Sequence, residues 1–132
     1  MLLVNTNVLV DVLQDDPQWA NWSIGQLRAQ ASIHQLAINP IIYAEISLSF
    51  STLEGLDSAM STLALELREI SRPALFLAAK AYAQYRKRGG SKLQMLRDFF
   101  IGAHAVVEGW PLLTRDPSRF RTYFPTLEVV AP

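Results

Sequence analysis

The sequence contains no cysteine, so disulfide bonds and thiolate metal sites are excluded from its 132 residues. It also lacks an excess of either charge, because 12 Lys and Arg residues balance 12 Asp and Glu residues. No overall field therefore attracts nucleic acid, and any such binding has to come from local clusters. The absence of thiols agrees with a reducing compartment, and we expect a cytoplasmic protein.

Long hydrophobic segments are missing as well. No apolar run approaches the roughly 20 residues that a membrane-spanning helix requires. The first residues, MLLVNTNVLVDVL, have no basic segment and no small-residue cleavage site, so we do not expect a signal peptide. Hydrophobic residues make up 50% of the chain, which is enough to bury one substantial core. We therefore expect a single domain over residues 1–132.

Short apolar runs alternate with helical patterns along the chain. Strands are expected at residues 2–4, 35–38, 111–114 and 127–130, and helices at 8–13, 16–31, 41–50, 54–67, 73–88 and 99–107. Such alternation predicts an α/β domain with a mainly parallel central sheet.

Two polar residues follow predicted strands. Asn5 stands at the end of the first strand, and Asp116 lies just beyond the strand at 111–114. In open α/β sheets the carboxyl ends of the strands are where ligands bind. Asp98 begins the most hydrophobic helix, whose N-terminus would stabilise an anion. Taken singly, each Asp is equally well interpreted as a helix cap or a turn residue.

Glu45 is harder to interpret as a surface residue. Ile41 and Leu48 flank it at helical spacing, which predicts a carboxylate within an apolar face. A buried carboxylate needs a cation, hydrogen bonds or protonation. The alternative is that the helix packs only through Ile42, Ile46 and Phe50 and leaves Glu45 at the surface.

These acidic positions are far apart in the sequence but could converge at one edge of the sheet. Clustered carboxylates without His or Cys suit a hard cation such as magnesium or manganese. Two such ions roughly 4 Å apart could hold the attacking water and the leaving oxygen of a phosphodiester. The residues therefore favour metal-dependent phosphodiester chemistry.

Four strings in order resemble the motifs of PIN domains over almost the full length of the chain. LVNTNVLVDVL resembles the opening strand and helix, where the family has an aspartate in place of Asn5. NPIIYAEIS resembles the second acidic motif and carries Glu45. DFFIGAHA, with Asp98, and LLTRDPSRFRTYFP, with Thr114 and Asp116, resemble the third and fourth motifs of bacterial VapC-type toxins.

The resemblance implies a three-layer α/β/α sandwich with a mainly parallel central sheet, formed by a single PIN domain over residues 1–132. It also implies a magnesium-dependent endoribonuclease, with manganese as a second candidate cofactor. The expected partners are an RNA substrate, a cognate antitoxin protein that inhibits the enzyme, and a second copy of the chain in a homodimer.

The same resemblance assigns roles to individual residues. The catalytic and metal-binding positions would be Asn5, Glu45, Asp98 and Asp116. The supporting hydrogen-bonding residues would be Thr6, Asn7 and Thr114, for which capping and turn formation are the alternative. We expect Asp11 to be outside the metal site and solvated.

Two local basic clusters could hold RNA phosphates. The candidate contacts are Arg86, Lys87, Arg88, Lys92 and Arg115. A solvated helix end is the commoner meaning of the first cluster, since cations favour helix C-termini. We expect His34 and His104 to serve packing or hydrogen bonding rather than metal binding.

Asn5 is the clear departure from the family pattern. An amide oxygen can bind magnesium but brings no negative charge, which should weaken the site. A non-catalytic PIN-like module that binds RNA or protein is therefore the competing hypothesis. A phosphoacceptor signalling domain is disfavoured, because no Lys follows the late strand. Since the other three acids are in place, we interpret Asn5 as an inactivating substitution and expect little or no activity.

Overall fold

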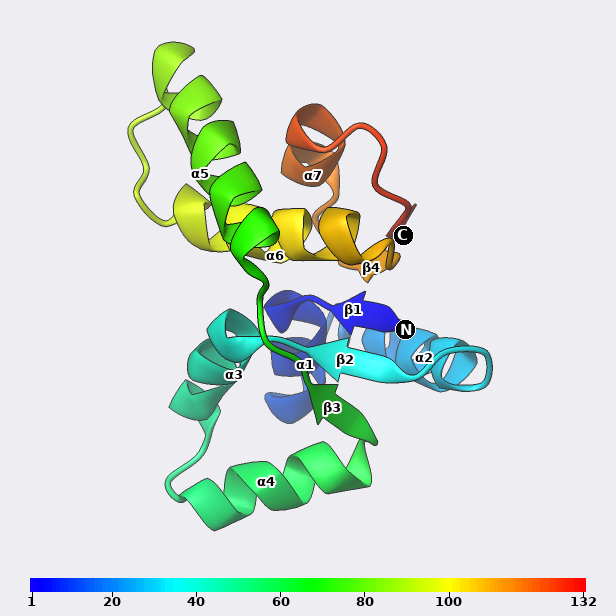
Figure 1. The fold of residues 1–132 in the computed structure, drawn as a ribbon. Helices are drawn as coiled ribbons and strands as arrows, with labels where there is room; N and C mark the ends of the chain where they lie inside the picture. The colour runs from blue at the N-terminus through cyan, green and yellow to red at the C-terminus, as the bar shows by residue number, and fades with distance from the viewer.

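Five parallel strands form one sheet in the computed structural model, which describes residues 1–132 (Figure 1). The strands are β1 (Leu2–Val4), β2 (Leu36–Ile38), β3 (Leu65–Leu67), β4 (Leu112–Leu113) and β5 (Val129–Val130). Their order is β3-β2-β1-β4-β5, and every neighbouring pair is parallel. The predicted parallel α/β sheet is confirmed.

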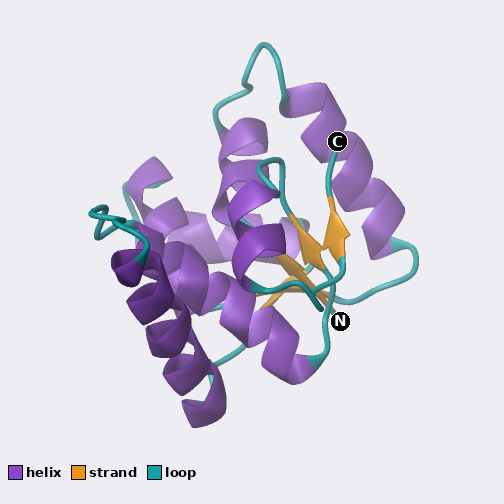
Figure 2. Ribbon diagram, turned by 90° about the horizontal axis from the view of Figure 1, so that it is seen from above, coloured by secondary structure: helices purple, strands orange, loops and turns teal.

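Helices cover the sheet on both sides, which Figure 2 shows with the strands lying between them. They are α1 (Thr6–Leu13), α2 (Ala20–Ala31), α3 (Pro40–Ile46), α4 (Leu53–Thr62), α5 (Arg72–Lys87), α6 (Met95–Glu108) and α7 (Ser118–Tyr123). A short 3-10 helix, η1 (Ser47–Ser49), extends α3. The arrangement is the predicted three-layer α/β/α sandwich. None of these helices has the length and hydrophobicity that a membrane crossing requires.

The core is centred on β1 and α6. Leu2, Leu3 and Val4 have no exposed surface, as expected of a central parallel strand that is covered on both faces. Phe99 and Ile101 of α6 are equally buried. The strand ends beside this core therefore form a rigid frame for the polar residues that follow them.

The residue pairs Asn39-Pro40 and Asp16-Pro17 each combine a capping residue with a proline, but only the first pair begins a helix. The Asn39 side chain accepts a hydrogen bond from the amide of Ile42 (3.0 Å), so α3 begins at Pro40, one residue before the helix predicted over residues 41–50. Asp16 instead accepts hydrogen bonds from the amides of Gln18 and Trp19, both at 2.9 Å. It therefore caps a turn, and α2 begins only at Ala20.

The predicted helix over residues 54–67 is wrong at its end. Helix α4 stops at Thr62, Ala64 has a φ of 54°, and the next three residues form β3 against β2. The segment LALEL fits the period of a helix and that of a strand equally well. It forms a strand because β2 has an unpaired edge with which it can pair. Helix α7 was not predicted, since its single turn and a half buries only Phe120.

Candidate functional site

The sheet has a topological switch point between β1 and β4. Strands β2 and β3 lie on one side of β1, whereas β4 and β5 lie on the other. Ligands of parallel α/β sheets commonly bind in the crevice at the carboxyl ends of the strands at such a point. Asn5 directly follows β1, Thr114 directly follows β4, and both side chains are buried. The switch point is therefore lined by two of the predicted residues.

The side chain of Asn5 is held from two sides. Its Oδ1 accepts a hydrogen bond from the amide of Thr6 (2.8 Å) and so caps α1. Its Nδ2 donates to Oγ1 of Thr114 (2.9 Å), which joins the end of β1 to the end of β4. The amide is consequently fixed in orientation where the family has a carboxylate.

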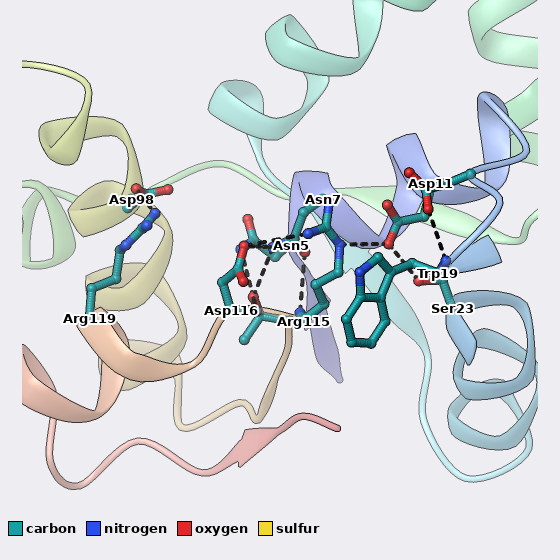
Figure 3. Close-up of polar contacts among 11 residues, drawn as sticks. Asn5, Asn7, Asp11, Trp19, Ser23, Asp98, Arg115, Asp116 and Arg119 are labelled. Carbon is teal, nitrogen blue, oxygen red and sulfur yellow. Dashed lines mark hydrogen bonds and ion pairs between the residues drawn. The ribbon is translucent and has the colours of Figure 1, made fainter. Parts of the chain in front are cut away.

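Thr114 is the centre of a larger network, of which Figure 3 labels Asn5, Asn7 and Asp116. Its Oγ1 also accepts hydrogen bonds from Nδ2 of Asn7 (3.3 Å) and from the backbone amide of Asp116 (3.2 Å). Nδ2 of Asn7 lies 3.4 Å from Oδ2 of Asp116. The structure thus brings together Asn5, Asn7, Thr114 and Asp116.

Glu45 lies at the edge of this network and not inside an apolar face. Oγ1 of Thr6 donates a hydrogen bond to Oε1 of Glu45 (2.8 Å), and Nη1 of Arg97 lies 3.8 Å from its Oε2. Helix α3 packs through the buried Ile42 and Ile46, whereas Leu48 is 90% exposed. The expectation of a carboxylate in a buried apolar face was wrong, and the alternative packing is the one observed.

Asp98 is in the first turn of α6 and pairs with Arg119 of α7. Burial raises the pKa of the Asp98 carboxyl, and the charge of Asp116 raises it further, while Arg119 and Arg97 act in the opposite direction. Figure 3 shows the Asp98–Arg119 pair to one side of the Asn5 network, with no hydrogen bond joining them. Asp98 and Asp116 therefore interact through their charges and not through direct contact.

The three carboxylates do not form a ready-made metal cage. No group of three or more His, Cys, Asp or Glu side chains lies close enough together to hold a metal ion. Each carboxylate is instead accompanied by an arginine, in the pairs Glu45–Arg97, Asp98–Arg119 and Asp116–Arg115. The side-chain atoms that could bind a metal ion here are all oxygen atoms, which magnesium and manganese prefer as ligands.

Asp11 is buried and not solvated, which corrects the expectation for this residue. Its side chain is 2% exposed and accepts hydrogen bonds from Oγ of Ser23 and Nε of Arg115, both at 2.9 Å. The hydrogen bond to Asp11 raises the pKa of Arg115. Arg115 was a candidate RNA contact, but its guanidinium is committed to this ion pair.

The other candidate RNA contacts are exposed. Arg86 and Lys87 lie in the last turn of α5, Arg88 follows them, and Lys92 is in the loop that leads into α6. The guanidinium of Arg88 lies 5.3 Å from the ring centroid of Tyr123. These four cations are therefore accessible to a charged ligand.

Sequence reasoning did not identify the partners of the acids. Arg97 pairs with Glu45, and Arg119 pairs with Asp98 from 21 positions away, so neither partner follows from proximity in the sequence. The prediction for His104 held: its Nδ1 lies 3.2 Å from Nδ2 of Asn39, and the ring is fully buried.

The family model for the PIN domain matches residues 2–124. The chain is similar to a solved structure of VapBC2 from Rickettsia felis bound to a promoter DNA fragment, with a TM-score of 0.75 and 20% identity over 99% of this chain and 98% of that chain. It is also similar to VapBC-1 from nontypeable Haemophilus influenzae, with a TM-score of 0.74 and 16% identity over 98% of this chain and 96% of that one.

A third solved structure is a toxin-antitoxin complex from Klebsiella pneumoniae, with a TM-score of 0.67 and 22% identity over 98% of this chain and 96% of that chain. No curated protein sequence gives a significant match. At these identities the solved structures establish a common fold.

Proposed function

The chain belongs to the PIN-domain family. We propose that it is a VapC-like toxin, that is, a metal-dependent endoribonuclease that a cognate antitoxin protein neutralises. The observation that carries the proposal is the network in which Thr114 joins Asn5 to Asp116 at the ends of β1 and β4. Polar side chains are buried at this edge, where parallel sheets bind ligands. The likeness in fold to toxin-antitoxin complexes adds support.

The residues that would hold Mg²⁺, with Mn²⁺ as the second candidate, are Asn5, Glu45, Asp98 and Asp116. A bound cation would supply a Lewis acid that activates water and stabilises the leaving oxygen of an RNA phosphodiester. Thr6 orients Glu45 through its hydroxyl, and Asn7 and Thr114 orient Asp116. The exposed cations at the end of α5 and in the loop that follows it would bind RNA phosphates and position the substrate.

Asn5 should leave this chain inactive or weakly active. The amide contributes no negative charge, so the affinity for a divalent cation falls and the attacking water is less well placed. Asp and Asn are nearly the same size, and the hydroxyl of Thr114 can either accept or donate a hydrogen bond. A carboxylate at position 5 would therefore receive a hydrogen bond from Thr114 where the amide now donates one.

The test is an RNA-cleavage assay that compares this chain with Asn5→Asp in Mg²⁺, in Mn²⁺ and in EDTA. We expect cleavage only from Asn5→Asp and only with metal, together with a free energy of unfolding within about 1 kcal/mol of the parent, since one hydrogen bond is exchanged for another. Glu45→Gln in the Asn5→Asp background removes a second proposed metal ligand. It should abolish cleavage while the protein remains folded. Cleavage that survives EDTA would point to a different chemistry.

The competing proposal is a non-catalytic PIN-like module that binds RNA or protein, and the neutral Asn5 is the observation that favours it. It would replace the nuclease proposal if Asn5→Asp folds and binds metal yet cleaves no RNA and does not inhibit growth.

Further parts of the main proposal are a single PIN domain over residues 1–132, a homodimer and a cytoplasmic location. Light scattering of the purified chain tests the dimer.

A further inference from the structure

A partly buried ion pair lies beside the proposed site, between the first two helices and the loop after β4. Asp11 of α1 has 2% of its side chain exposed, and Arg115 has 27% exposed. Ser23 of α2 donates the second hydrogen bond to the same oxygen of Asp11. The guanidinium of Arg115 also lies over the ring of Trp19, 5.7 Å from its centroid. Asp11 and Trp19 thus hold the arginine, and Ser23 holds Asp11 in place.

Arg115 reaches in two directions from this position, as Figure 3 shows. Its Nε binds Oδ2 of Asp11 at 2.9 Å, while Nη1 lies 3.8 Å from Oδ2 of Asp116. Its backbone amide donates to Oδ1 of Asn7 at 3.4 Å. Asp116 itself has a side chain that is 56% exposed, so few other contacts limit its orientation.

We propose that Arg115, anchored by Asp11, is a positioning residue that sets the orientation of Asp116 at the proposed site. The inference rests on the proposed function, because the orientation of Asp116 matters there for metal binding. The ion pair between Asp11 and Arg115 is a feature of the fold and does not depend on that function. Arg115 then acts through Asp116 and is not available to bind RNA. Asp11 is in turn a fixed counter-ion for Arg115 and not a metal ligand.

The chemistry of the side chain explains why an arginine is needed. A guanidinium presents donors in a rigid planar fork, so one side chain can face two carboxylates at a fixed separation. A lysine keeps the charge but has a single ammonium group on a flexible chain. Arg115→Lys therefore preserves the local charge and removes the two-way contact.

The experiment measures Mn²⁺ affinity by titration calorimetry in the Asn5→Asp background, with the metal alone as ligand. Arg115→Lys should weaken Mn²⁺ binding by about tenfold, the usual effect of removing a residue that orients a metal ligand. The same substitution should have no effect when Asp116→Asn is also present. The matched control is Arg121→Lys on the exposed face of α7, which should bind Mn²⁺ as tightly as the background. An equal loss with and without Asp116→Asn overturns the proposal, as does no loss at all.

A second measurement separates this proposal from the proposed function. The amide of Asp116 is bonded to Thr114 and that of Arg115 to Asn7, so their hydrogen exchange in the metal-free chain reports the loop directly. Arg115→Lys should accelerate exchange at both amides several-fold and leave the amides of β1 unchanged. If no variant binds Mn²⁺, the nuclease proposal fails, and unchanged exchange at both amides would overturn the positioning role as well.

Discussion

At the scale of single residues, His104 is a fully buried imidazole with an incomplete set of hydrogen bonds. Oδ1 of Asn39 is used by the amide of Ile42, so Nδ2 of Asn39 faces Nδ1 of His104 and donates to it. The Nε2 atom of His104 has no partner, and the ring packs against Trp110. The surroundings therefore favour the neutral imidazole.

This arrangement predicts a pH dependence of stability. Burial lowers the pKa of His104 below its ordinary value of 6.5, with the charge of Arg68 acting in the same direction and Glu108 opposing it. The unfolded chain then binds a proton more readily than the folded one, so the free energy of unfolding should fall as the pH drops from about 6.5 through the lowered pKa. His104→Gln keeps an acceptor for Asn39 and should make stability between pH 7 and pH 5 less sensitive to acid.

Urea unfolding at several pH values measures this effect. The matched control is His34→Gln, in a partly exposed position, which should keep the acid sensitivity of the parent chain. Identical pH slopes for the parent and for His104→Gln would contradict the assignment.

At the scale of secondary-structure elements, α6 and α7 approach closely at Gly102. A Cβ atom at this position would lie 2.5 Å from the ring of Phe124 and 3.1 Å from that of Phe120, and both rings are buried. The rings have little room to move, because the interior is tightly packed. The same two helices are also joined by the pair of Arg119 on α7 and Asp98 on α6.

Gly102→Ala should therefore destabilise the protein by about 1–3 kcal/mol, the usual penalty for overpacking a core. The matched control is Gly25→Ala in α2, where a Cβ would meet nothing within 4 Å. That substitution should stabilise the helix by roughly 0.5–1 kcal/mol, because alanine loses less backbone freedom on folding than glycine does. Chemical denaturation of the two variants tests the pair, and equal stabilities would show that α6 and α7 can separate at little expense.

At the scale of the whole molecule, three carboxylates that already attract arginines of this chain form a suitable receptor for an arginine of another protein. We expect the cognate antitoxin to insert such a side chain, since charge-assisted hydrogen bonds to carboxylates are strong and directional. The neutral Asn5 should not prevent the complex from forming. Co-expression with the antitoxin should therefore yield a complex with this chain.

Calorimetric titration of the antitoxin should then show that Glu45→Gln and Asp98→Asn each weaken binding by about 1.5–3 kcal/mol, the range for hydrogen bonds to charged groups. Glu128→Gln is the matched control, because Glu128 precedes β5 and is therefore at the opposite edge of the sheet. If neither Glu45→Gln nor Asp98→Asn changes the affinity for the antitoxin, the interface lies elsewhere.

The features that the sequence determined alone have local causes. The run Leu2–Val4 had to be a buried strand because it is short, apolar and followed by a capping residue. Asn39-Pro40 had to begin a helix because the cap and the proline act on adjacent backbone groups. The alternation of such elements was sufficient for the fold class, and the order of four acidic motifs was sufficient for the family.

The features that only the tertiary structure decided depend on partners distant in the sequence. Asp11 was expected to be solvated, yet Arg115, which lies 104 positions away, makes it a buried counter-ion. The strand β3 exists because β2 offers an open edge, and Glu45 is partly exposed because α3 turns Ile42 and Ile46 inward. Burial and charge pairing are properties of neighbours in space, and a local pattern cannot specify them until long-range contacts have brought those neighbours together.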